Sequence, residues 1–125
     1  MPRFNFRRGD TIKLRSQIFG SDKKPLDLTG CKVWFTLKYR VQDSDAAALA
    51  QVTTDSSVPV GGGVTILDAK NGQIGIRVPP AATSGLADQT WELPYDIQVK
   101  DPTEDIATAE TGTIIIDADV TRAIT

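Results

Sequence analysis

The sequence predicts an all-β fold in which two sheets pack face to face. Three observations support this: one segment alternates apolar and polar residues, similar segments recur along the chain, and turn residues separate them. The clearest segment is 31–38, continued to residue 40. Its outward residues include a tryptophan, Trp34. Its inward face is predicted to consist of Cys31, Val33, Phe35, Leu37 and Tyr39.

The same alternation recurs in five further segments, 11–18, 64–67, 73–78, 93–100 and 106–117. Asn71-Gly72 is typical of a tight hairpin turn between two of them. About seven short strands at this spacing favour an immunoglobulin-like β-sandwich, with a small barrel as the alternative. The predicted core comprises Ile12, Leu14, Val33, Phe35, Leu37, Ile74, Ile76, Tyr95, Ile97, Val99, Ile114 and Ile116.

The alternation stops after residue 40. Asp43, Ser44 and Asp45 precede the alanine-rich segment 46–51, which predicts a capped helical turn or one short helix crossing between strands. Residues 52–63 are rich in Thr, Ser and Gly, so we expect a loop there.

The length of 125 residues predicts one domain, 1–125, with short terminal arms at about 1–8 and 118–125. The single cysteine, Cys31, excludes an intrachain disulfide and is predicted to act as a small buried hydrophobe. No apolar run approaches the roughly 18 residues of a membrane helix. The N-terminus lacks the apolar core of a signal peptide. We therefore expect synthesis in the cytoplasm and no membrane partner.

The chain contains no histidine, which removes the commonest general base and the commonest metal ligand. We therefore expect no enzymatic activity, no cofactor and no transition metal. Asp101, Glu104 and Asp105 could offer oxygen ligands to Ca²⁺, but their spacing matches no EF-hand, so a solvated turn is favoured. The tripeptide 8–10, Arg-Gly-Asp, is best interpreted as a turn before the first long strand rather than an adhesion motif.

Charge is distributed unevenly along the chain. Residues 1–40 contain ten Lys/Arg and three Asp/Glu, a net +7, whereas residues 41–125 contain four Lys/Arg and thirteen Asp/Glu, a net −9. Either the folded protein has two oppositely charged surfaces suited to packing against neighbours, or basic early strands pair with acidic late ones. The basic residues lack the interleaved aromatics of a nucleic-acid site, so no direct nucleic-acid partner is expected.

A protein interface is predicted from apolar residues that the core does not use. Trp34 and Ile115 point outward by the alternation, and an outward tryptophan is typical of a protein–protein anchor. Its alternative is a tryptophan covered by a loop. The predicted interface consists of Trp34, Ile115, Phe4, Phe6, Val120 and Ile124.

Several segments resemble the immunoglobulin-like modules of tailed-bacteriophage virion proteins. They are residues 8–11, 26–38, 62–66 with Asn71-Gly72, 95–99, and 111–116 followed by 119–122. The chain is similar to the N-terminal domain of baseplate upper proteins and of related tail and fibre-attachment proteins. Unlike in the multidomain members, no fibre or lectin domain is expected to follow the module.

This resemblance implies a non-enzymatic assembly adaptor in the tail, baseplate, collar or fibre attachment of a virion. Its implied partners are other virion structural proteins in a symmetric multi-copy assembly. The alternatives are a capsid decoration protein, or a small adhesin or carbohydrate-binding module.

Overall fold

The structure, a computed structural model, describes residues 2–87 and 89–118. These residues form nine strands and two short 3₁₀ helices. The strands are β1 (Arg3–Arg7), β2 (Ile12–Gln17), β3 (Lys32–Leu37), β4 (Ala50–Thr53), β5 (Ser57–Val58), β6 (Gly63–Asp68), β7 (Gln73–Val78), β8 (Trp91–Lys100) and β9 (Ile106–Asp117). The 3₁₀ helices are η1 (Asp45–Ala47) and η2 (Pro80–Ala82).

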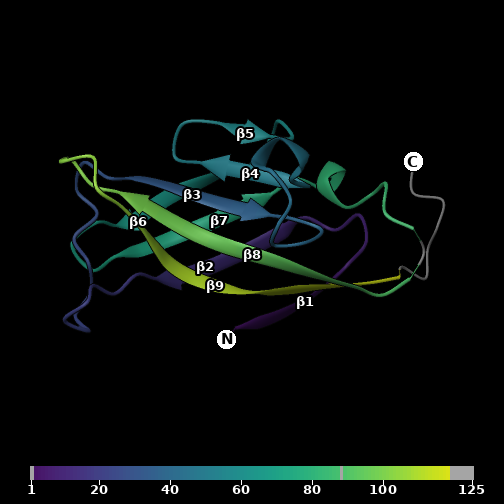
Figure 1. The fold of residues 1–125 in the computed structure, drawn as a ribbon, viewed down its shortest axis with the longest axis horizontal. Helices are drawn as coiled ribbons and strands as arrows, with labels where there is room; N and C mark the ends of the chain where they lie inside the picture. Colours follow the sequence, from purple (N-terminus) through teal and green to yellow (C-terminus); the bar gives the residue numbers. More distant parts are fainter. Residues whose placement is uncertain (1, 88, 119–125) are drawn as a thin grey trace.

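The strands form two sheets packed face to face, which confirms the predicted β-sandwich (Figure 1). The larger sheet has six strands in the order β1-β9-β8-β3-β4-β5, and the smaller has three in the order β2-β7-β6. The larger sheet carries β4 and β5 beside β3, as the sheet of a variable-type immunoglobulin domain carries two extra strands. The described residues thus form nine strands, compared with the seven predicted. Strand β1 pairs with β9 in parallel, while the other pairs in both sheets are antiparallel.

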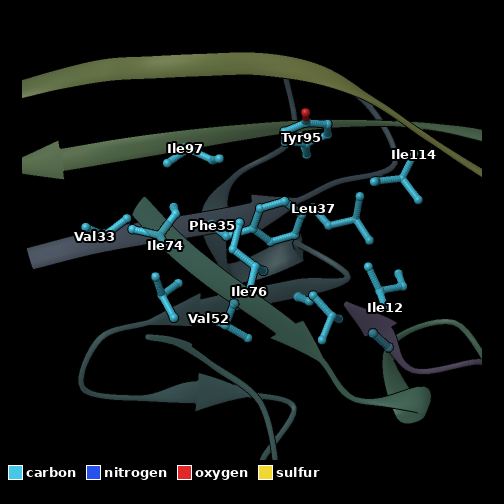
Figure 2. Close-up of a cluster of buried hydrophobic side chains, with 14 of the residues drawn as sticks. Ile12, Val33, Phe35, Leu37, Val52, Ile74, Ile76, Tyr95, Ile97 and Ile114 are labelled. Atoms are coloured by element: carbon cyan, nitrogen blue, oxygen red, sulfur yellow. The ribbon is translucent and has the colours of Figure 1, made fainter. Parts of the chain in front are cut away.

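The core lies between the sheets and contains the residues predicted from the alternation, except that Leu14 is only partly buried. Figure 2 shows Phe35 near its centre, with Tyr95 and Ile97 of β8 above it and Ile76 of the smaller sheet below it. The ring of Phe35 stacks on that of Tyr95, with 5.2 Å between the centroids. Burial of this kind stabilises by about 1.5–3 kcal/mol for each large apolar side chain.

The central strand is shorter than its sequence pattern predicted. Strand β3 ends at Leu37, so Tyr39 lies beyond the sheet, where it is 43% exposed instead of buried. Its ring meets the edge of the Trp91 ring at 5.7 Å. Cys31 precedes the strand and is half-buried against the core.

The crossover predicted at 46–51 is helical only over η1, and Ser44 makes no side-chain capping bond. Ala48 is already extended, and Ala50 and Gln51 belong to β4, which pairs with β3. Ala50 and Val52 are fully buried there. The helix propensity of a few alanines is a weak preference, and burial beside β3 outweighs it. The predicted loop 52–63 likewise contains the end of β4 and all of β5.

The predicted Asn-Gly hairpin joins β6 to β7. Gly72 has a φ of +67°, and a Cβ there would lie 2.5 Å from the carbonyl oxygen of Ile18. Glycine is thus needed both for the left-handed backbone and for the close approach. The amide of Ile18 donates to the carbonyl of Gly72, so this turn also fixes the end of β2. Within the described residues, no helix is long and apolar enough to cross a membrane.

Candidate interaction faces

Trp34 lies on the outer face of the six-stranded sheet, as the alternation predicted. It is flanked by Thr53 of β4 and Gln98 of β8, and its side chain is half-buried. The ammonium of Lys32 lies 4.9 Å from the ring centroid and also pairs with the carboxylate of Asp55 at 3.3 Å. An aromatic ring on a strand paired on both sides is held rigidly, and polar groups surround it, as in interface anchors.

Ile115 lies on the same outer face but far from Trp34. It pairs across to Glu92 of β8, whereas Trp34 pairs across to Gln98 of the same strand. Six residues along a strand span about 20 Å. The structure therefore places these two predicted interface residues on one face without bringing them together.

Between them the outer face has a shallow hollow of about 140 Å³. Thr36, Pro94 and Asp96 line it, and Val41, which is 78% exposed, projects beside it. Burial raises the pKa of Asp96, an effect that nearby Lys38 opposes. The ammonium of Lys38 instead pairs with the Asp45 carboxylate at 2.9 Å.

Phe4 and Phe6 do not belong to a loose arm, which corrects the predicted boundary at residues 1–8. They lie on β1, whose five residues pair with residues 113–117 of β9. Both side chains pack against the core while remaining half-exposed, and the Phe4 ring lies 6.3 Å from that of Tyr95. They close the sandwich at this end. Val120 and Ile124, the other two predicted arm residues, lie outside the described part of the chain.

Ion pairs within the larger sheet and its loops join some of the early basic residues to later acidic ones. Arg3 pairs with Glu92 at 2.8 Å, and Lys32 and Lys38 pair with later acidic residues as described above. Lys13 and Arg77 lie directly opposite each other on the outer face of the smaller sheet. Neither forms a salt bridge within the described residues. The pairing of early basic residues with later acidic ones is therefore present in the larger sheet and its loops.

The tripeptide 8–10 forms a turn, in keeping with its interpretation from sequence. Gly9 has a φ of +81° and its amide donates to the hydroxyl of Thr83, while the Arg8 guanidinium donates to the carbonyl of Leu86. The acidic segment 101–105 is also a turn. Hydrogen bonds from Thr103 lower the pKa of Asp101, and the bond from the Thr103 hydroxyl has the largest effect. Among the described residues, no group of three or more His, Cys, Asp or Glu could hold a metal ion.

A groove that the sequence did not predict lies between the first half of β9 and the connection from β2 to β3. Its volume is about 660 Å³, and Phe19 and Ile106 at its rim are 51% and 61% exposed. Cys31 also lines it, and burial raises the pKa of this thiol, with Asp101 and Asp27 adding to the effect. The sequence hinted at this groove only in that residues 106–112 contain no lysine or proline, the residues that commonly protect an exposed strand edge.

No protein-family model and no curated protein matches this sequence. Among solved structures, the chain is similar to AggA, the major subunit of aggregative adherence fimbriae type I from Escherichia coli. The TM-score is 0.36 at 15% sequence identity, covering 94% of this chain and 89% of AggA. A likeness this weak adds nothing to the fold seen in the strand order.

Proposed function

We propose that this protein is a non-enzymatic structural component of a tailed-phage virion, an adaptor that joins neighbouring proteins in the tail, baseplate, collar or fibre attachment. The phage context rests on the resemblance of its strand and turn segments to virion modules. The adaptor role rests on the surface of the folded domain.

The observation that carries the adaptor role is Trp34 on the outer face of the six-stranded sheet. Its strand, β3, is paired on both sides, so the ring is presented without the entropy loss of ordering a loop. Lys32, Thr53 and Gln98 form a polar rim around it. Aromatic anchors inside polar rims carry most of the free energy of many protein interfaces.

The test is a Trp34→Ala variant supplied in trans to a phage that lacks the gene. We expect the isolated variant to keep its thermal midpoint within a few degrees, because the ring is not part of the core. We also expect it to be depleted at least several-fold from purified particles, as measured by quantitative mass spectrometry. Thr65→Ala is the matched control, since Thr65 is exposed on a strand of the other sheet.

Wild-type protein absent from purified particles would refute the virion assignment. Normal incorporation of the Trp34→Ala variant would refute the anchor while leaving the virion assignment intact. The copy number relative to the major capsid and tail-tube proteins would separate a tail position from capsid decoration.

A further inference from the structure

The outer face of the smaller sheet carries three positive charges at neighbouring positions. Lys13 of β2 pairs directly across from Arg77 of β7, and both side chains are exposed. Two residues further along β2, the exposed Arg15 pairs across from Gly75. Side chains two residues apart on a strand share a face and lie about 7 Å apart. The charges therefore project from three corners of a rectangle, and the fourth corner carries no side chain.

A hollow of about 380 Å³ opens at this rectangle, and we call it the basic hollow. It is lined by Lys13, Arg15, Arg77 and Gly75, with Leu67 of β6 as one wall. A second hollow of about 300 Å³ continues along β2 and shares Arg15 and Leu67 with the first. Neither hollow is lined by an acidic residue.

Nothing in the described part of the chain neutralises these charges. None of the three cations forms a salt bridge within residues 2–87 and 89–118. The only acidic residue on β2, β6 and β7 is Asp68, whose carboxylate accepts hydrogen bonds from Asn71 in its own turn. Like charges directly opposite each other, as Lys13 and Arg77 are, destabilise a sheet. The folded domain thus keeps an unfavourable charge arrangement that a bound anion would relieve.

Gly75 keeps the space among the cations open, although the backbone does not require a glycine there. Its φ is not in the left-handed region. An added Cβ would meet only the Leu67 side chain, at 3.5 Å, which is an ordinary contact. Glycine inside a strand lowers stability, and it often marks a position where a ligand approaches the backbone closely. The missing side chain is therefore a second sign of a binding site.

We propose that the basic hollow binds an acidic segment of a partner protein, with a carboxylate seated over Gly75 among Lys13, Arg15 and Arg77. Guanidinium groups offer paired N–H donors that match the two oxygens of a carboxylate. Leu67, which is 47% exposed, offers an apolar contact to the aliphatic part of the bound side chain. Charge complementarity thus specifies the chemistry of the partner.

A nucleic acid fits the basic hollow less well than an acidic protein segment does. Strands β2, β6 and β7 contain no aromatic residue on which a base could stack. Three cations neutralise at most about three phosphates, which gives only weak binding at physiological salt. The chain also has a net charge of −2, so its surface as a whole does not attract a long polyanion. A compact group of carboxylates needs only the local positive charge.

The inference goes beyond the proposed function and does not depend on it. Trp34 lies on the outer face of the larger sheet, whereas the basic hollow lies on the outer face of the smaller one. An adaptor with both sites would hold a different neighbour on each face.

The experiment uses the full chain labelled with nitrogen-15 and a synthetic peptide with blocked ends, Glu-Val-Glu-Val-Glu. Alternate side chains of an extended peptide lie about 7 Å apart on one face, the spacing of Lys13 and Arg15. At about 50 mM salt, where screening is weak, we expect saturable shifts of the backbone amides of Lys13, Arg15, Gly75 and Arg77. A matched peptide with Gln in place of Glu should bind at least about tenfold more weakly, because it forms no ion pairs.

Two variants test the hollow separately from the fold. Gly75→Val fills the hollow without changing the charge, and valine favours strands, so the protein should fold while peptide affinity falls at least about fivefold. Lys13→Thr should weaken binding about threefold to fivefold, the effect of one exposed ion pair, while raising the thermal midpoint of the free protein. Lys24→Thr, the matched control, removes a positive charge from an exposed turn and should leave affinity unchanged. Thr65→Ala, a neutral change at the wall of the hollow, should also leave it unchanged.

Several results would overturn the proposal. One is the absence of these amide shifts at about 5 mM peptide, a concentration that reveals millimolar affinity. Others are equal binding of the Gln peptide and unchanged affinity in both Gly75→Val and Lys13→Thr. A ten-nucleotide oligothymidylate that binds more tightly than the peptide at about 150 mM salt would assign the hollow to nucleic acid instead. Trp34→Ala should bind the peptide normally, so a failure of the Trp34 anchor and a failure of this site are distinguishable.

Discussion

Residues 113–117 and residues 106–112 belong to one strand, β9, but only the first group has a neighbour on the side away from β8. In the covered half, Ile114 and Ile116 are completely buried. In the open half, Ile106 is 61% exposed and the groove lies beside it. The open half also contains Ala107, Ala109 and Gly112, which favour strands less than the three isoleucines of the covered half. The seam of the sandwich is fully packed where β1 closes it, and apolar side chains stay exposed where no strand lies beside β9 within the described residues.

The largest effect should separate the two halves directly. Ile114→Ala removes a fully buried side chain, and such truncations cost about 2–5 kcal/mol through lost burial and the remaining cavity. Ile106→Ala alters an exposed side chain and should change stability by no more than about 0.5 kcal/mol. Urea denaturation of both variants at constant slope gives the two values. Equal losses would show that both halves are packed alike.

A smaller effect is expected from the strand that covers the seam. Phe4→Ala should cost about 2 kcal/mol, roughly half the value for a fully buried phenylalanine, because its ring is half-exposed. Hydrogen exchange should accelerate most at the amides of Thr113 and Arg8, whose bonds hold β1 and its end against the chain. Phe19→Ala, at the rim of the groove, is the control and should leave both amides protected. Unchanged exchange in Phe4→Ala would mean that β1 is held by its backbone bonds alone.

The hydrogen bonds at the boundary between the two halves should contribute less. Glu110→Gln keeps one acceptor oxygen but loses the carboxylate that links Ser16 of one sheet to Tyr95 of the other. We expect a loss of about 1 kcal/mol, the net value of a typical hydrogen bond. Burial and the Glu110 carboxylate raise the pKa of Tyr95, so Glu110→Gln should move the tyrosine absorbance titration toward lower pH. Glu104→Gln, in an exposed turn, should change neither quantity.

Both halves of β9 were predictable from sequence as one strand, 106–117, whereas the absence of a neighbour beside its first half was not. Ile114 and Ile116 alternate with outward residues, which is a local signal that burial preserves. Phe4 and Phe6 show the same alternation, but five residues with arginine at both ends gave too little pattern to indicate a strand. The groove forms because the connection at 18–27 packs against the beginning of β9, a contact between segments about 80 residues apart in sequence.

The candidate interface was likewise predictable only in part. The outward directions of Trp34 and Ile115 follow from alternation within their strands. Their separation does not, because it is set by the register of β8 against β3 and β9. The alanine-rich segment at 46–51 predicts a helix because its local propensity carries no information about the buried position of β4 beside β3.

The smallest effect concerns the turn that leads into the open half of β9. Hydrogen bonds from Thr103 and Asp105 lower the pKa of Asp101, so the folded state favours its ionised form. The resulting stabilisation is fully present above the ordinary value of 3.8 and is lost as the pH falls through the lower folded value. Asp101→Asn should therefore flatten the decline of the thermal midpoint between about pH 5 and pH 2. Asp96 provides the opposite sign, because burial raises its pKa and its ionisation opposes folding as the pH rises. Asp96→Asn should thus raise the midpoint at neutral pH and have little effect near pH 2. If both variants shifted the midpoint equally at every pH, the two carboxylates would affect stability through packing rather than ionisation.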